Sequence, residues 1–239
     1  MTPPDEPGPG LLRIDLHLHT RASYDCMSDP VAVLERARER GVERIAVTDH
    51  DTLGLALELH ERYPDRIIPG EEIRTREGVD VIGWYLSEEI PRGTPAKETC
   101  ERIREQGGIV YLPHPYAPGK GGSGRLAEEL APLVDVVESM NSRVRPMARN
   151  QKGADLARRH GRLQGAGSDA HTVGEVARSW VEVPHHPNEA EALLRALARG
   201  RVHGVISPRW VHLASTWAKV RKRIVPRTRK APAEVSMQP

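Results

Sequence analysis

Two histidines, His17 and His19, lie two residues apart at the end of a short apolar run at 11–14. Side chains at positions i and i+2 of a β-strand point to the same face, so both imidazoles can reach one point in space. Neutral imidazole is the commonest metal ligand near neutral pH. The chain has 11 histidines in 239 residues, so this pair could arise by chance, and the rest of the sequence must decide.

The same arrangement, an apolar run followed by a residue type that binds metals, returns four times along the chain. The runs at 45–47, 67–70, 109–112 and 165–168 lead to Asp49-His50, Glu71-Glu72, His114 and Asp169-Ala170-His171. In an α/β barrel the carboxyl ends of the strands meet at one face, where residues distant in sequence form a site. Five such strand ends in chain order predict a metal centre.

Short strands and helices alternate along the chain, as expected for an α/β fold. Helices are predicted at 31–40, 53–63, 94–106, 145–160 and 188–199, and strands at 11–14, 42–47, 66–68, 79–86, 109–112, 134–138, 163–166, 180–183 and 202–206. A strand–helix–strand unit at 11–48 implies a parallel strand pair. About seven such units in this length favour a barrel with a largely parallel sheet.

The composition fits one barrel-sized domain with an appendage. We expect a flexible segment at 1–10, a barrel at 11–208 and a basic helix and tail at 209–239. Hydrophobic residues make up 38% of the chain and Phe is absent, so the core must consist of Leu, Val, Ile and Ala. The amino-terminal residues do not resemble a signal peptide, and no apolar run has the length of a membrane span. A cytoplasmic protein without a membrane partner is therefore expected.

The carboxyl-terminal segment concentrates positive charge. Residues 209–230 hold eight basic and no acidic residues, while the whole chain has a net charge of only +2. Such a block is usually solvated, and nucleic acid or an anionic surface is the alternative partner. Trp210 and Trp217 lie at helical spacing, and we expect them to dock this segment onto the barrel.

Together these motifs resemble the PHP family, named for polymerase and histidinol phosphatase. The resemblance spans residues 11–171 in the family's order, and its motifs are His17-Leu18-His19-Thr20, Ser23 and Asp25, Thr48-Asp49-His50-Asp51, Pro69-Gly70-Glu71-Glu72-Ile73, His114-Pro115 and Gly167-Ser168-Asp169-Ala170-His171. It implies a distorted (β/α)7 barrel, two or three divalent metal ions and phosphoester hydrolysis.

The resemblance also implies three sets of metal ligands. The first set is His17, His19, Glu72 and Asp169; the second is Asp25, His50 and His171; the third is Glu72 as a bridge, His114 and one further residue. Glu72 is preferred to Glu71 because the family's motif reads Pro-Gly-x-Glu. Mixed imidazole and carboxylate ligands suit Zn, Mn and Fe.

One position departs from the family's pattern. Asp80 stands where the family usually carries a histidine, within the stretch Val79-Asp80-Val81-Ile82-Gly83-Trp84. A carboxylate can bind the same metals, so we predict Asp80 as the further ligand of the third ion. The alternative is a third ion that binds weakly or not at all.

Three residues are predicted to act on the substrate. Arg143 follows a strand and could bind phosphate through two hydrogen bonds, with Arg21 as the second choice. The alternative for both is a surface arginine. His203 is predicted as the general acid for the leaving group, although a single histidine in this position is more often structural.

These observations predict a metal-dependent phosphoesterase. It would hydrolyse a phosphomonoester or phosphodiester of a small metabolite or nucleotide, with a metal-bound hydroxide as nucleophile. One alternative is a nuclease that trims single-stranded nucleic acid and holds it with the basic tail. Another is a barrel that binds metal without catalysis.

Overall fold

The computed structural model describes residues 8–119 and 121–224. Most of the predicted flexible segment at 1–10 and the part of the basic tail after residue 224 lie outside this range. Within it, nine strands form one sheet in the order β7-β6-β5-β4-β3-β2-β1-β8-β9. The strands are β1 (Leu11–Leu18), β2 (Arg44–His50), β3 (Ile67–Arg74), β4 (Asp80–Trp84), β5 (Ile109–Leu112), β6 (Val136–Asn141), β7 (Leu163–Gly167), β8 (Ser179–Pro184) and β9 (Arg201–Gly204).

The mixed α/β fold with a barrel-shaped sheet agrees with the prediction, but the expected strand directions were only half right. The pairs β1–β2, β2–β3, β5–β6 and β6–β7 are parallel, whereas β3–β4, β4–β5, β1–β8 and β8–β9 are antiparallel. The turn between β3 and β4 is too short for a helical crossover, and Gly78 has a φ of 78° there. The count of seven strand–helix units is not confirmed.

The first strand and the segment after β7 nearly close the sheet into a barrel. The Asp169 amide donates to the His17 carbonyl at 2.7 Å, and the His19 amide donates to the Ala170 carbonyl at 3.0 Å. A Cβ on Gly167 would lie 2.3 Å from the Cβ of His17. Glycine is therefore required at residue 167 for these two segments to approach each other.

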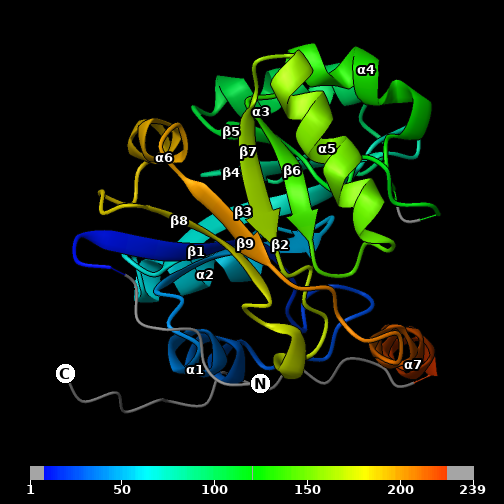
Figure 1. The fold of residues 1–239 in the computed structure, drawn as a ribbon. Helices are drawn as coiled ribbons and strands as arrows, with labels where there is room; N and C mark the ends of the chain where they lie inside the picture. The colour runs from blue at the N-terminus through cyan, green and yellow to red at the C-terminus, as the bar shows by residue number, and fades with distance from the viewer. Residues whose placement is uncertain (1–7, 120, 225–239) are drawn as a thin grey trace.

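Seven α-helices are described: α1 (Pro30–Glu39), α2 (Gly54–Arg62), α3 (Ala96–Glu105), α4 (Ala127–Leu130), α5 (Met147–Arg159), α6 (Ala190–Leu197) and α7 (Val211–Ile224). Asp29 caps α1 by accepting the Val31 amide at 3.0 Å. Figure 1 shows α3, α4 and α5 on one side of the sheet, α1 and α2 on another, and α7 apart from them, beyond the arrowheads of β6 and β7. None of the helices in the described chain is both long and apolar enough to cross a bilayer.

The buried apolar residues form two clusters. One joins α1, α2, α3 and α5 to the sheet, and the other includes Trp84 and Tyr111 and contacts α6. The Trp84 and Tyr111 rings lie 4.5 Å apart and are fully buried, so aromatic residues fill part of a core that lacks Phe.

Candidate metal centre

The strand ends bring eight of the nine predicted metal ligands into one cluster. Seven of the eight are buried, and His50 is partly exposed. They come from the ends of β1, β2 and β3 and from the loops after β1, β5 and β7, and they are His17, His19, Asp25, His50, Glu72, His114, Asp169 and His171. The cluster therefore lies at the carboxyl ends of the parallel strands, as the strand-end pattern predicts.

His17, His19 and Asp169 form the first group of atoms that could hold one ion. The two Nε2 atoms of His17 and His19 lie 3.2 Å apart. Glu72 Oε2 lies 3.5 Å from His17 Nε2 and 3.3 Å from His19 Nε2. Asp169 Oδ1 lies 3.5 Å from His19 Nε2. These are the members of the first predicted ligand set.

Asp25, His50 and His171 also converge. Asp25 Oδ1 lies 3.3 Å from His171 Nε2 and 3.6 Å from His50 Nε2. The imidazoles of His50 and His171 together with His19 form a second group that could hold an ion. The second predicted set therefore lies together and adjoins the first through His19.

Glu72 connects the third group to the other two. Its Oε1 lies 3.0 Å from His114 Nε2, and its Oε2 lies 3.0 Å from His50 Nδ1. Asp80 instead pairs with Arg74, with 2.5 Å between Arg74 Nε and Asp80 Oδ1. Burial and the charge of Glu72 raise the pKa of Asp80 to about 7. A ligand role for Asp80 stays a prediction.

The donor atoms suit divalent ions. Asp25 Oδ1 and Glu72 Oε2 are buried oxygens that accept no hydrogen bond, and both face imidazole nitrogens. Burial of such oxygens without a partner is costly, and an ion between them and the imidazoles would remove that cost. The residues therefore fit the metals that the resemblance implies.

The charges of the cluster shift the pKa values of its members in opposite directions. Burial alone would lower the pKa of His17, but the charges of Glu138 and Glu72 raise it well above its ordinary value. Burial and the neighbouring His171 and His50 lower the pKa of His19 to about 3. The pKa of Glu72 is well below its ordinary value, because His50 and His17 outweigh the effect of burial.

Two further carboxylates orient the cluster, and sequence reasoning did not assign the first of them. Glu138 on β6 is 3.1 Å from His17 Nδ1 and accepts the His114 amide at 2.6 Å. In the sequence it appears as a carboxylate within an apolar strand, three residues before Asn141. Asp49 accepts the amide and hydroxyl of Thr20 and the amide and hydroxyl of Ser23. Both carboxylates hold the loops that carry the ligands.

Two of the ligands have unusual backbone angles. The φ of His114 is 28° and that of Asp169 is 51°. Non-glycine residues rarely adopt such angles, which cost on the order of 1–3 kcal/mol each and occur often at functional sites. The surrounding hydrogen bonds, such as Asp169 to the His17 carbonyl, hold this conformation.

The structure brings only one of the three predicted substrate-binding residues to the cluster. Arg143 lines the cleft and is buried, where its Nε lies 3.2 Å from Glu175 Oε1. Arg21 instead pairs with Asp29 outside the cleft at 2.5 Å. His203 stacks on Trp180, with ring centroids 5.6 Å apart, and does not line the cleft.

Helix α7 contributes residues that the sequence did not assign to the site. Ser215, Thr216 and Lys219 line the cleft, which has a volume of about 350 Å³. Lys219 Nζ lies 3.5 Å from Asp25 Oδ2. The prediction that Trp210 and Trp217 dock this segment was wrong, because they are 63% and 65% exposed. Polar contacts of Ser215 and Lys219 and the buried residues Val211 and Ala218 dock it instead.

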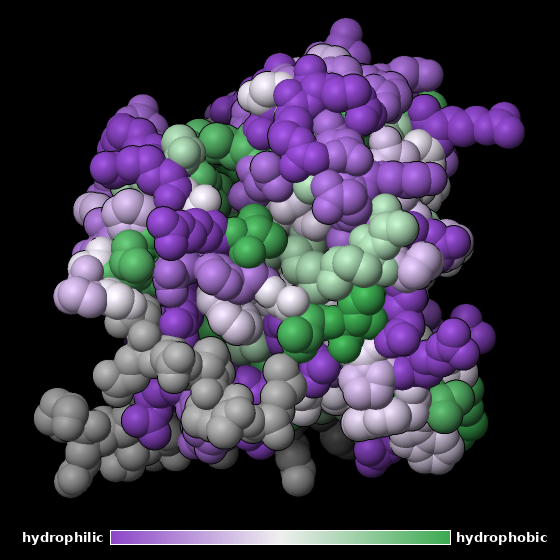
Figure 2. Space-filling model, viewed as in Figure 1, coloured by the Kyte–Doolittle hydropathy of each residue, from purple (hydrophilic) through white to green (hydrophobic). Residues whose placement is uncertain are grey.

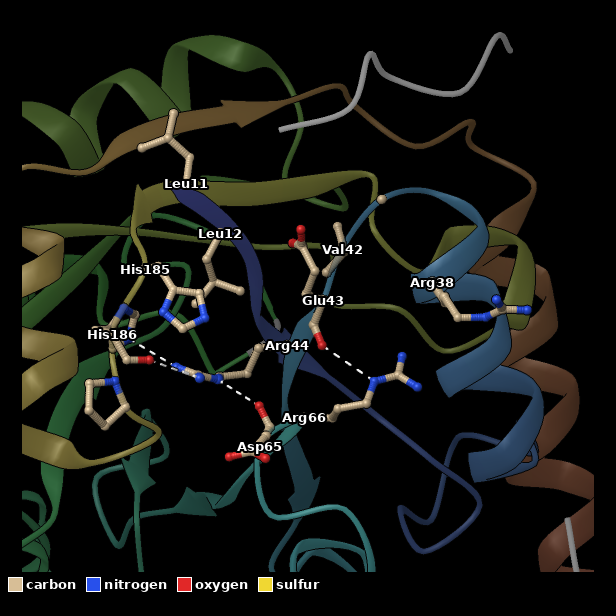
Figure 3. Close-up of a pocket in the computed structure, with 12 residues that line it drawn as sticks. Leu11, Leu12, Arg38, Val42, Glu43, Arg44, Asp65, Arg66, His185 and His186 are labelled. Atoms are coloured by element: carbon tan, nitrogen blue, oxygen red, sulfur yellow. Dashed lines mark hydrogen bonds between the residues drawn. The ribbon is translucent and has the colours of Figure 1, made fainter. Parts of the chain in front are cut away.

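A larger cavity, of about 630 Å³, lies at the opposite ends of the strands (Figure 3). Its most buried polar residue is Arg44, whose Nε donates to the Asp65 carbonyl at 3.0 Å and whose Nη2 donates to the His186 carbonyl at 3.2 Å. Arg44 Nη1 lies 3.0 Å from His186 Nε2. The guanidinium of Arg44 thus has hydrogen-bond partners within the cavity wall. None of the predicted metal ligands lines this cavity.

Several known proteins resemble this chain in sequence. The sequence profile of the PHP domain matches residues 15–107, and that of a PHP-associated region matches residues 148–202. An uncharacterised protein of Methanocaldococcus jannaschii is 35% identical over 176 residues, which cover 72% of this chain and 70% of that protein. The 5'-3' exoribonuclease Rnm of Escherichia coli is 27% identical over 208 residues, which cover 82% of this chain and 57% of the exoribonuclease.

Among solved structures, a two-domain protein of Bacteroides vulgatus contains a predicted PHP-like metal-dependent phosphoesterase. It matches with a TM-score of 0.64 at 16% identity, over 90% of this chain and 73% of the other. The fold and the site thus define a metal-dependent hydrolase of phosphoester bonds. The chain belongs to the PHP family.

Proposed function

We propose that the protein hydrolyses a phosphoester of a small molecule, such as a nucleotide or phosphorylated metabolite, in the cleft beneath α7. The observation that carries this proposal is the position of α7 across the metal-ligand cluster. Arg143 Nη2 donates to Ser215 Oγ at 2.5 Å, and Lys222 Nζ donates to the Arg21 carbonyl at 2.7 Å. These bonds hold the helix over a cleft of about 350 Å³, a size suited to a small ligand.

The three ligand groups would hold two or three ions, with Zn, Mn and Fe as the candidates. When bound, such ions neutralise phosphate charge and make water more acidic. The chain's own residues fix the imidazoles for this task. His17 Nδ1 faces Glu138 Oε1, and His171 Nδ1 donates to the Asp169 carbonyl at 2.8 Å. Both Nε2 atoms are therefore left to face the cluster.

The cleft also offers groups that could bind the rest of the substrate. Lys219 is 44% exposed at the mouth, where its Nζ lies 5.3 Å from the centroid of the Tyr24 ring and 3.5 Å from Asp25 Oδ2. Tyr24 stacks on His50 with ring centroids 5.0 Å apart. A half-exposed aromatic ring beside a cation suits a phosphorylated molecule that carries a flat base or sugar.

A nuclease that trims single strands is the second candidate. The likeness to an exoribonuclease favours it, as does the basic carboxyl-terminal segment. The small-molecule proposal is preferred because α7 narrows the cleft. Only the end of a single-stranded nucleic acid would fit into a cleft of this width.

The test begins with elemental analysis of the purified protein, followed by assays with Mn, Zn and Fe. The panel contains nucleoside monophosphates, sugar phosphates, cyclic phosphodiesters and 5'-phosphorylated RNA oligonucleotides. We expect the highest kcat/KM on one of the small esters. A higher kcat/KM on oligonucleotides would replace this proposal with the nuclease. Bound metal without turnover of any ester would contradict both.

A further inference from the structure

The outward face of α7 is an apolar stripe. Leu213, Trp217, Val220 and Ile224 are 72%, 65%, 44% and 72% exposed. Their spacing of four, three and four residues places them along one side of the helix. Exposed apolar residues usually occur singly, and a continuous stripe marks a surface that binds something.

The inner face of the same helix is fixed by polar contacts. Ser215 accepts from Arg143, Lys219 pairs with Asp25, and Lys222 donates to backbone carbonyls of the loop after β1. Helices on a protein surface ordinarily turn their apolar side inward. Here the inner side carries the polar contacts together with the buried residues Val211 and Ala218, and the larger apolar side chains of the stripe stay in solvent.

Basic residues accompany the stripe. Arg209, Arg221 and Arg223 form no ion pair with a carboxylate within the described chain. No acidic residue occurs between 209 and 230, and Arg227, Arg229 and Lys230 follow in the sequence. Figure 2 shows apolar residues beside strongly hydrophilic ones in the region of α7, at the lower right. A partner for this surface must therefore combine apolar contact with negative charge.

We propose that α7 lies on the surface of a bilayer that contains anionic lipids. The stripe would enter the boundary between headgroups and acyl chains, and the arginines would contact lipid phosphates. Three of the four stripe residues are aliphatic and cannot stack on nucleic-acid bases, which argues against single-stranded nucleic acid as the occupant. The expectation of no membrane partner rests on the lack of a segment with the length of a span, and an anionic surface is the alternative partner of the basic segment; the proposal develops that alternative.

The position of α7 gives this contact a consequence for the site. The helix that touches the lipid also lines the cleft through Ser215, Thr216 and Lys219. The mouth of the cleft would then lie close to the bilayer surface. The inference does not depend on which phosphoester is hydrolysed.

The test uses the full chain in sedimentation with phosphatidylcholine vesicles, with and without phosphatidylglycerol. We expect binding that requires phosphatidylglycerol and a blue shift of tryptophan emission from Trp210 and Trp217. The double variant Leu213→Ser/Trp217→Ser should bind at least tenfold more weakly. The matched control Met147→Ser/Val205→Ser changes two apolar residues that are 46% and 41% exposed elsewhere, and it should bind like the wild type.

Charge is tested separately. Arg221→Glu/Arg223→Glu should lose at least tenfold in binding, whereas Arg199→Glu/Arg201→Glu, on the β9 side of the molecule, should not. The proposal would be overturned if the Leu213→Ser/Trp217→Ser variant bound vesicles as well as the wild type does, or if tryptophan emission did not shift. It would also be overturned if sedimentation velocity showed a dimer that buries the stripe. Hydrolysis is measured without vesicles, so failure of the proposed function is recognised independently.

Discussion

At the scale of single residues, the site depends on imidazoles whose second nitrogen is already occupied. His17 Nδ1 faces Glu138 and His19 Nδ1 lies 3.0 Å from Ser23 Oγ. The two Nε2 atoms then face each other across 3.2 Å. The ring orientations are thus set by the protein before any ion binds, which lowers the cost of assembling the site.

Replacement of Glu138 tests this orientation. Glu138→Gln keeps the size of the side chain but loses a charged acceptor beside His17 and His114. We expect metal affinity to fall by about 10–100-fold, measured by competition with a chromogenic chelator. Glu182→Gln is the control, because Glu182 pairs with Arg13 away from the cleft. Equal affinity in both variants would refute the orienting role.

The adjacent Glu71 provides a prediction for pH. Burial raises its pKa from 4.5 to about 8, and its Oε2 accepts the Ile90 amide at 2.9 Å. The folded state holds this proton more tightly than the unfolded state does. The contribution of protonated Glu71 to the stability of the folded state is therefore complete below pH 4.5, and it is lost as the pH rises through 8.

Relative to Glu71→Gln, the wild type should lose up to about 1.4 kcal/mol of unfolding free energy per pH unit between pH 5 and 7.5. Urea unfolding of both proteins across this range measures the difference. Parallel pH profiles would show that Glu71 is ionised in the folded state.

At the scale of elements, close contact between the ends of β1 and β7 brings together ligands from the first strand and from the segment after the seventh. Gly167→Ala would force the new Cβ against His17, at 2.3 Å in the present geometry. We expect a loss of about 1–3 kcal/mol in stability and weaker metal binding. Gly174→Ala is the control, because its Cβ would meet only Thr172 Oγ1, at 4.0 Å. Denaturant unfolding and metal titration of the two variants provide the comparison.

The sequence predicted those parts of the molecule that depend on the order of apolar and polar residues within a short segment. The ligand residue types follow short apolar runs, and strand geometry then places them at one end of the sheet. It did not predict the position of α7, because contacts such as Ser215 with Arg143 join residues far apart in the chain. Trp217 illustrates the error: helical spacing was read as inward packing, although the polar side of α7 faces the cleft.

Two of the three predicted substrate-binding residues, Arg21 and His203, lie outside the cleft for the same reason, whereas Arg143 lines it. Arg21 was chosen because it directly follows the motif His17-Leu18-His19-Thr20, but Asp29 holds it outside the cleft. His203 was chosen for its place near the last strand, and the antiparallel β8–β9 pair stacks it on Trp180 instead. Lys219 lines the cleft without any local motif, and only the folded chain reveals it.

At the scale of the whole molecule, the cluster concentrates negative charge in the interior. Glu72, Glu138 and Asp169 are all buried beside the imidazoles. When the ions are removed, the buried carboxylate charges are balanced only by the imidazoles beside them. We expect a chelator to lower the Tm by about 5–10 °C. This is the stabilisation that an ion provides when its free concentration is about a hundred times its Kd.

Differential scanning fluorimetry with and without chelator measures this change, and re-addition of Mn or Zn should restore the original Tm. As a control, His171→Ala removes a predicted ligand and should respond less to the chelator. An unchanged Tm in the wild type would show that the ions do not support the fold.

The hydrogen bond from the Asp169 amide to the His17 carbonyl joins the first strand of the barrel to a segment that follows its seventh. Ligands from both segments meet in two of the three groups that could hold an ion, whereas the third group, His17 with Glu72 and His114, lies within residues 17–114. During synthesis on the ribosome, the two groups that include Asp169 or His171 can therefore form only after those residues have emerged. Metal loading of these two groups then follows the synthesis of the first seven strands, while the third group has all of its residues once His114 has emerged.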